Sequence, residues 1–366
     1  MNITLSYNLT MNSEIIFGAF IISFLCSFFI NAVSRGIARK NKIFIDLPDK
    51  NRKFHKRSTP LTGGISIFLG SILAIYLMGA LGIYSIQQTL YQYAVLTCSA
   101  LIVITFLIDD AKELSSSIRL FAQTFIAFII VIWSETYLIN LGDLFGIGLI
   151  ILNKPASIIF TVFCIVGVMN AFNMIDGING LCSGLAFMAM LFMGIFYNGF
   201  INTHLVYAVG AIAGFLIFNL GIIGNKRWVF LGDHGSNLLG FLTAISMIGA
   251  SQEIRFDFSP ITALWLISIP FLDCIGLILK RISKGVGPFT ADRDHLHHKL
   301  MAKGYSANKT LVIILCIAIS SSLIGIYLQS NYSDSTSFFC FIIYSIVFYY
   351  FSHTFFKSKK LELVND

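Results

Sequence analysis

Long apolar runs separated by short polar segments dominate the pattern of this chain. The runs carry glycine and β-branched residues, and none shows the alternation of polar and apolar positions that is typical of strands. Because a backbone that crosses hydrocarbon must satisfy its own hydrogen bonds, such runs predict membrane-spanning helices. We predict eleven, at residues 14–34, 61–84, 91–108, 118–134, 155–174, 180–198, 205–223, 236–252, 260–279, 308–328 and 337–356.

The positive charges are distributed unevenly between the loops. Residues 1–13 contain no Lys or Arg, whereas Arg35, Arg39, Lys40 and Lys42 follow the first run, which places the N-terminus outside and argues against a cleaved signal peptide. Eleven crossings then put the loops 35–60, 109–117, 224–235 and 280–307 and the C-terminal tail in the cytoplasm. With the adjoining helix ends, these segments hold 23 of the 25 Lys and Arg residues.

The predicted fold class is therefore an all-α, polytopic membrane helix bundle of about eleven transmembrane helices. Its N-terminus is outside and its C-terminus is cytoplasmic, and residues 1–366 form a single integral membrane domain whose four cytoplasmic loops make up the active face. The net charge of +7 at pH 7 fits a basic cytoplasmic face that attracts anionic membrane lipid. Nucleic acid is not an expected partner, because the basic residues are split among loops without a recognised binding module.

Candidate catalytic residues gather on the predicted cytoplasmic side. Paired aspartates end the third run in "LIDDAKELSSSIRL", one aspartate ends the fifth in "NAFNMIDGING", and another precedes the eighth in "FLGDHGSNLLG"; these are Asp109, Asp110, Asp176 and Asp233. Adjacent carboxylates repel, and a divalent cation is one reason for them to be ionised together. Mg²⁺ is commonly held by one or two carboxylates plus phosphates, so these aspartates predict a metal diphosphate site. A solvated helix end is the alternative for the pair alone.

Two further segments suit phosphate. Ser236 in "GDHGS" could cap the eighth helix, whose free N–H groups could receive an anion. The segment "GPFTADRDHLHHKL" supplies Arg293 for bidentate phosphate binding and His295, His297 and His298 for proton transfer or donation to phosphate. The spacing of these histidines is poor for zinc ligation on one helical face.

Taken together, the motifs resemble those of the polyprenyl-phosphate N-acetylhexosamine-1-phosphate transferases. The similarity is closest to the bacterial undecaprenyl-phosphate GlcNAc-1-phosphate transferase branch of this glycosyltransferase family 4 type, with phospho-MurNAc-pentapeptide transferase as a more distant relative. It runs from about residue 44 to 305 and rests, in order, on "DLPDKNRKFHKRSTPLTGGIS", "DD" with "IRL", "NAFNMIDGING", "LGIIGNKRWVFLGDHGS", "SPITALWLISIPFLD" and "DRDHLHH".

The resemblance implies a Mg²⁺-dependent phosphotransfer, with Mn²⁺ as a substitute, in the bacterial cytoplasmic (inner) membrane. The phosphate of undecaprenyl phosphate attacks the β-phosphorus of UDP-GlcNAc, which releases UMP and leaves undecaprenyl-diphospho-GlcNAc. This would be the first membrane step of a cell-surface polysaccharide pathway such as that of the lipopolysaccharide O-antigen. The resemblance also implies a homodimer, with UDP-sugar and undecaprenyl phosphate as substrates.

By motif position, the resemblance assigns roles to individual residues. Asp233 matches a direct metal ligand, and Asp109 and Asp110 match a pair that handles metal or lipid phosphate. Asp176 matches a required polar position of the nucleotide region. The remaining matches are expected to bind substrate, and they are Lys53, His55, Asn173, Asn179, His234, Arg293, His295, His297 and His298.

Two positions depart from the pattern of these relatives. Asn179 replaces a common aspartate, and His234 replaces a common small residue, where it could crowd the phosphate site or add a cation. These changes are compatible with a different accepted sugar or with a weakened enzyme. The same reaction with another UDP-N-acetylhexosamine, such as one carrying GalNAc, QuiNAc or FucNAc, therefore stays an alternative. A secondary transporter is the remote alternative, disfavoured because transporters place ionisable groups near the midplane and contain repeats. Asp273, inside the ninth run, is expected to support the bundle rather than to react.

Overall fold

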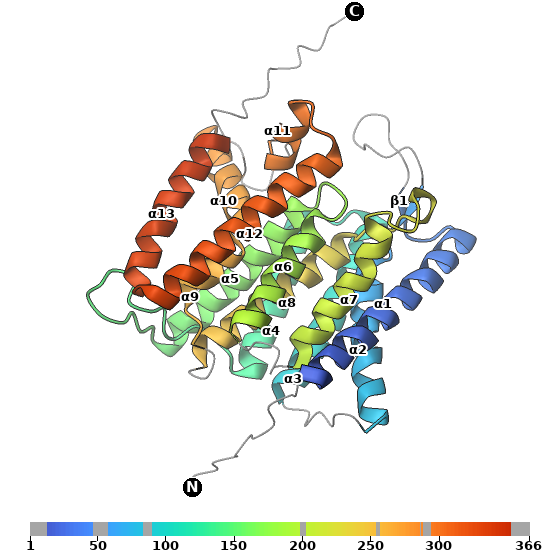
Figure 1. The fold of residues 1–366 in the computed structure, drawn as a ribbon, viewed down its shortest axis with the longest axis horizontal. Coiled ribbons are helices and arrows are strands. Elements are labelled where there is room, and N and C mark those ends of the chain that lie inside the picture. Colours follow the sequence, from blue (N-terminus) through green and yellow to red (C-terminus); the bar gives the residue numbers. More distant parts are fainter. Residues whose placement is uncertain are drawn as a thin grey trace, which may run out of the picture.

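The computed structural model describes residues 13–46, 58–82, 90–197, 203–253, 257–285, 287 and 294–352. It is a bundle of helices (Figure 1). The helices are α1 (Ser13–Asn41), α2 (Gly63–Ala80), α3 (Leu90–Lys112), α4 (Ser116–Ser134), α5 (Lys154–Ile175), α6 (Leu181–Phe196), α7 (Thr203–Asn219), α8 (Asp233–Gln252), α9 (Pro260–Leu266), α10 (Ser268–Ser283), α11 (Leu296–Ala302), α12 (Ala307–Asn331) and α13 (Asp334–Tyr350), with a 3₁₀ turn, η2, at Asn225–Arg227.

The all-α prediction is confirmed in its main feature, and every predicted apolar run contains a helix. Within the described ranges, six helices are long and apolar enough to cross a membrane, namely α1 to α5 and α12, and a seventh span results if α9 and α10 are counted together. The predicted absence of strands is wrong in one detail. β1 (Ile45–Asp46) and β2 (Thr59–Pro60) form a short antiparallel pair.

The predicted continuous helix at 260–279 is also wrong, because α9 and α10 are bent by 85° at Ile267. Pro270 explains the break. It has no N–H to donate to the carbonyl of Leu266, and its ring would clash with that carbonyl in a continuous helix. Accordingly, α9 ends at Leu266 and α10 begins at Ser268.

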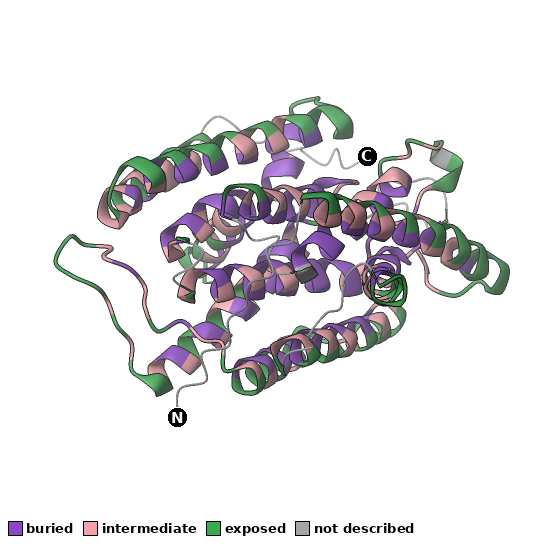
Figure 2. Cartoon of the chain, turned by 60° about the horizontal axis from the view of Figure 1, so that its bottom comes forward, coloured by how far each residue is buried: buried purple, intermediate pink, exposed green. Residues whose placement is uncertain are grey.

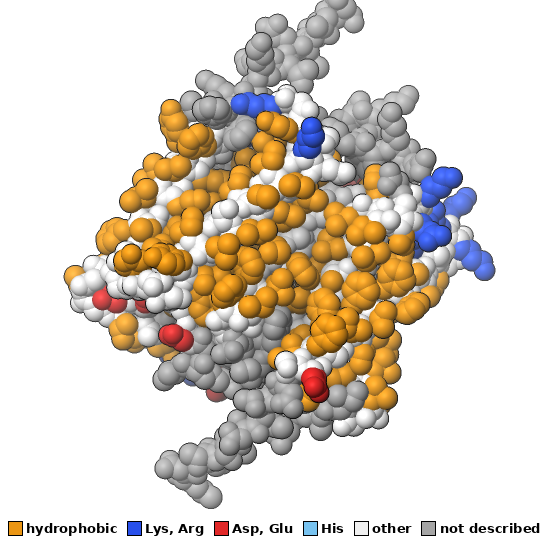
Figure 3. All heavy atoms as spheres, viewed as in Figure 1, with side chains coloured by type: hydrophobic (Ala, Val, Ile, Leu, Met, Phe, Trp, Pro, Cys, Tyr) orange, Lys and Arg blue, Asp and Glu red, His pale blue; other side chains and the backbone are white. Residues whose placement is uncertain are grey.

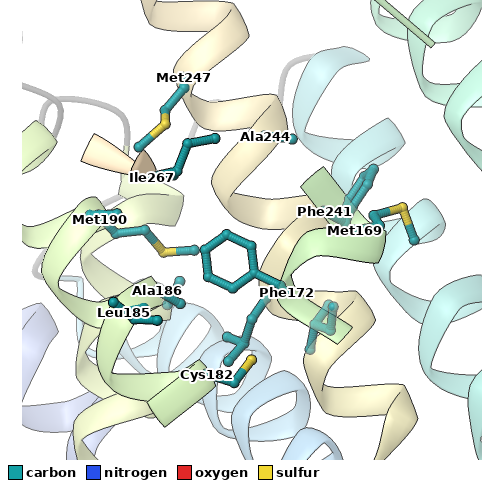
Figure 4. Packing of buried hydrophobic residues seen from close by; sticks show 14 of the residues in the cluster. Met169, Phe172, Cys182, Leu185, Ala186, Met190, Phe241, Ala244, Met247 and Ile267 are labelled. Carbon is teal, nitrogen blue, oxygen red and sulfur yellow. The ribbon is translucent and has the colours of Figure 1, made fainter. Parts of the chain in front are cut away.

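The centre of the bundle is formed by α6, α8 and the inner face of α5. Figure 2 shows the buried residues gathered in the middle of the molecule, with exposed residues on the outer helices. Figure 4 shows Phe172 of α5 between side chains of α6, such as Met190, and of α8, such as Phe241. Gly240 lets α8 approach α5 closely, because a Cβ there would lie 2.7 Å from the Cα of Met169. This close packing brings the C-terminal end of α5 next to the N-terminal end of α8, where Asn173 contacts Asp233.

The outer surface is apolar, which suits a lipid environment. Phe17, Phe121 and Phe163 have exposed fractions of 67%, 71% and 71%. In Figure 3, hydrophobic side chains cover the middle of the visible face, with Lys and Arg along its upper and right edges and Asp and Glu near the opposite edge. A large exposed apolar surface of this kind marks a membrane or protein contact.

Candidate active site

The paired aspartates lie in the last turn of α3, and Asp109 fixes the corner between α3 and α4. One oxygen of its carboxylate accepts the N–H of Leu114 at 2.8 Å, and the other lies 3.1 Å from Nε of Arg119. Only 1% of the Asp109 side chain is exposed. Burial raises the pKa of Asp109, and the N–H of Leu114 and the guanidinium of Arg119 offset this only in part.

Asp110 faces the N-terminus of α8. Its Oδ1 accepts the N–H of Asp233 at 2.9 Å, and its Oδ2 accepts the N–H of His234 at 3.4 Å and lies 2.5 Å from Nδ1 of the same residue. A carboxylate in this position satisfies free N–H groups and complements the helix dipole. The predicted cap, Ser236, is wrong, because Gly232 is the N-cap residue and Ser236 lies inside the helix.

His234 is fully buried. Glycines border its ring on two sides, since a Cβ at Gly64 would lie 2.5 Å from Cδ2 and one at Gly232 would lie 2.6 Å from Cε1. The ring is therefore enclosed by protein, with its Nδ1 against the carboxylate of Asp110.

Asp233 is more accessible than Asp109 or Asp110, with 38% of its side chain exposed. Its Oδ1 accepts a hydrogen bond from Nδ2 of Asn173 at 3.0 Å, and its Oδ2 lies 3.6 Å from a terminal nitrogen of Arg119. Enclosure by protein atoms, followed by repulsion from Asp110 and Asp109, raises the pKa of Asp233 to about 6. Negative charge at this position is thus incompletely neutralised.

Asp176 forms the C-cap of α5 and has an exposed side chain. Enclosure by neighbouring atoms, with repulsion from Asp233 and Asp110, raises the pKa of Asp176 to about 8. The Asp176 side chain is accessible to solvent, so a cation could reach it. Such a cation would relieve the repulsion of Asp176 from Asp233 and Asp110. Asn179 is half-buried in the turn that follows.

The three histidines lie at the start of α11, which packs against α10 and against the turn that follows α5. His295 Nδ1 lies 2.7 Å from Oδ2 of Asp273, whose Oδ1 accepts the N–H of Leu296 at 2.9 Å. Asp273 thus holds the start of α11 on α10, which agrees with its expected supporting role. The ring of His297 is 4.2 Å from that of His298 and 5.5 Å from that of His295, measured between centroids.

His297 joins this cluster to the turn after α5. A Cβ at Gly177 would lie 1.9 Å from Nε2 of His297, so the ring sits directly on the residue next to Asp176. His297 is 1% exposed, and neither ring nitrogen has a hydrogen-bond partner among the residues that the structure describes. Burial, then repulsion from His298 and His295, lowers the pKa of His297 to about 3, so the ring is neutral near pH 7.

The structure therefore brings together most of the predicted site, in one group around Asp233 and a second around Gly177. Lys53, His55 and Arg293 lie outside the described residues.

Sequence reasoning missed Arg119 as a partner of the aspartates and Gln123 as a buried polar residue. The available signal was their spacing of four on one helix, which places both on the same face.

These donors fit a hard divalent cation. Asp233 and Asp176 offer accessible carboxylate oxygens. Enclosure is the larger cause of the raised pKa of each, and the repulsion between carboxylates that adds to it is the part that such a cation would relieve. Across the described ranges, no group of three or more His, Cys, Asp or Glu side chains could hold a metal ion. A Mg²⁺ ion that shares its ligands with phosphate and water does not need such a group.

Comparison with known proteins identifies the family. Residues 92–251, which include the aspartates, match Glycosyl transferase family 4. Relatives called undecaprenyl-phosphate alpha-N-acetylglucosaminyl 1-phosphate transferase are 34% identical in Yersinia pestis, covering 87% of this chain and 84% of the relative, and 31% identical in Escherichia coli K12, covering 88% and 85%. The Haemophilus influenzae relative is 32% identical, covering 91% and 93%. The chain therefore belongs to the family of the undecaprenyl-phosphate alpha-N-acetylglucosaminyl 1-phosphate transferases, within glycosyl transferase family 4.

Proposed function

We propose that this protein transfers N-acetylglucosamine 1-phosphate from UDP-GlcNAc to undecaprenyl phosphate. The products are undecaprenyl-diphospho-GlcNAc and UMP, and the reaction is the first membrane step of a cell-surface polysaccharide pathway. The names of the relatives support the substrates. The structural observation that carries the proposal is the convergence of Asp110, Asp233 and Arg119 at the ends of apolar helices. A lipid phosphate and a water-soluble diphosphate can meet at such a place.

The proposed topology has eleven crossings, with the N-terminus outside and the active face in the cytoplasm of a bacterium, at its inner membrane. The uneven distribution of Lys and Arg supports this orientation. A homodimer is proposed from the resemblance alone.

Phosphoryl transfer mainly requires that two anions are neutralised and aligned. We assign Asp233 as a direct ligand of Mg²⁺, or of Mn²⁺ in its place, with Asp176 beside it. When bound, the cation would neutralise charge on the diphosphate. Asp109 and Asp110 contribute through their negative charge and through their contacts with Arg119 and with the start of α8.

The lipid phosphate needs little help from a strong base. A phosphomonoester has its second pKa near 6 and is largely dianionic at pH 7, so it can attack the β-phosphorus directly. One oxygen of the lipid phosphate forms the new P–O bond while the bond between the β-phosphorus and the bridging oxygen breaks. UMP leaves with that oxygen.

The second group of residues is assigned to the sugar nucleotide. We propose that His295, His297, His298 and Arg293 hold the sugar diphosphate, and that Asn179 contacts the nucleotide. His297 is neutral near pH 7 and buried against Gly177, so it supports the turn beside Asp176 without adding charge there. Asn173 acts on Asp233 itself, and Lys53 and His55 are assigned to the substrate from their motif.

The test is the identity of the lipid product. Purified protein would receive undecaprenyl phosphate, Mg²⁺ and either UDP-GlcNAc or UDP-GalNAc, and the extracted lipid would be analysed by mass spectrometry. We expect a diphosphate lipid that carries GlcNAc. A product with GalNAc only would change the assigned sugar, and a labelled sugar that accumulates in sealed vesicles without entering lipid would favour transport instead.

A further inference from the structure

A layer of amide side chains, two of them buried (Gln123 and Asn237) and one half-buried (Asn170), lies beneath the aspartates. Its centre is Gln123 of α4, which is 2% exposed. Nε2 of Gln123 donates to Oδ1 of Asn237 on α8 at 2.7 Å, and Oε1 accepts from Nδ2 of Asn170 on α5 at 2.8 Å. Three helices therefore contribute one amide each to a single hydrogen-bonded chain.

The same three helices carry the residues around the Asp233 carboxylate. Arg119 lies four residues before Gln123, Asn173 three residues after Asn170, and Asp233 four residues before Asn237. Residues spaced by three or four lie on the same helical face, so the amide layer repeats the active-site layer one turn further inside. The two layers are joined directly, because Nδ2 of Asn237 donates to the backbone carbonyl of Asp233 at 2.8 Å.

We propose that Gln123 is a positioning residue that fixes the geometry of the Asp233 site. A buried amide that loses its partner costs free energy, so rotation or sliding of α4, α5 or α8 past one another is penalised. The arrangement that satisfies the amides is also the one in which Asn173 and Arg119 reach Asp233, at 3.0 and 3.6 Å. This inference rests on the proposed function, because it assigns the cation and the diphosphate to Asp233.

The test compares Gln123→Leu with Thr124→Val. Thr124 is the exposed neighbour on α4, and its hydroxyl donates only to the carbonyl of Leu120 in its own helix. Mn²⁺ binding would be measured by electron paramagnetic resonance on the purified full chain, beside kcat and KM for UDP-GlcNAc. Loss of a residue that orients a metal ligand typically costs about 10- to 100-fold in metal affinity or activity.

We expect Gln123→Leu to weaken Mn²⁺ binding and lower kcat by about ten-fold or more, and Thr124→Val to match the wild type. A folded Gln123→Leu protein with wild-type Mn²⁺ affinity and kcat would overturn the proposal. If Gln123→Leu does not fold, Asn170→Ala removes only one partner of Gln123 and should show a smaller change in the same direction; no change there would also overturn it.

The proposed reaction can be refuted independently of the positioning role of Gln123. Wild-type protein that binds Mn²⁺ but releases no UMP would refute the reaction, and the Mn²⁺ affinities would still decide the role of Gln123. Wild-type protein that binds no Mn²⁺ under any substrate condition would refute the positioning role together with the metal assignment.

Discussion

Gly177 offers the sharpest test of how the histidine cluster is placed. A methyl group at this position would lie 1.9 Å from Nε2, 2.5 Å from Cε1 and 2.8 Å from Cδ2 of His297. The φ angle of Gly177 is outside the left-handed region, so alanine is acceptable to the backbone itself. The effect of Gly177→Ala is therefore steric, and it acts on one identified side chain.

The clash cannot be relieved without a cost. His297 is buried, and Asp273 holds the two residues before it, through the ring of His295 and the N–H of Leu296. Either the ring leaves its position or α11 moves away from α10. Overpacking of this kind destabilises a protein by about 1–3 kcal/mol. Displacement of α11 would also move the proposed diphosphate-binding histidines from Asp176, so activity should fall with stability.

The assay is thermal unfolding in detergent together with UMP release. Gly167→Ala is the matched control, because no atom lies within 4 Å of a Cβ at that position and alanine favours a helix by up to about 1 kcal/mol. Adding His297→Ala to Gly177→Ala removes the clash and should recover stability without recovering activity. A Gly177→Ala protein with wild-type melting temperature and turnover would refute the packing of His297 on Gly177.

Three further predictions concern charged and titrating groups. Because the pKa of His297 is lowered to about 3, the unfolded chain binds a proton between pH 6.5 and 3 that the native protein does not, so stability should fall as the pH drops below 6.5. The loss by pH 5 is about 2 kcal/mol, and the melting temperature of His297→Gln should depend less on pH. Asp233→Ala should abolish UMP release from correctly inserted protein, whereas Asp257→Ala, on the predicted outer side, should leave it unchanged; equal activities would contradict the site. His234→Ala should destabilise the protein by about 3–5 kcal/mol, because it leaves the buried carboxylate of Asp110 without its side-chain partner; an unchanged melting temperature would contradict that pairing.

The helices were largely predictable because hydrocarbon solvent forces long apolar runs to satisfy their own backbone. The break between α9 and α10 follows from Pro270 but was missed, since a single proline is compatible with a kinked helix as well as with a broken one. The short helix α11 was also missed. Its seven residues carry no long apolar face, and it is held by the contact of Asp273 with His295, across 22 positions of sequence.

The composition of the site was predictable, but the contacts of its members were not. Motif order placed Asp110, Asp233 and His234 in one region. It did not show that Asp110 faces the start of α8, because this depends on how α3 packs on α8. Gln123 carried two weak signals, an amide within an apolar run and its spacing of four from Arg119. Its role becomes visible when α5 and α8 are placed beside α4.

The central claim is that this protein joins a sugar phosphate to a lipid phosphate. The most direct measurement is UMP release by purified protein given UDP-GlcNAc and Mg²⁺, with and without undecaprenyl phosphate, and with chelator as a further control. We predict UMP release that requires both the lipid and the divalent cation, with one UMP for each lipid diphosphate formed. UMP release that is independent of lipid, or none from folded protein, would contradict the account.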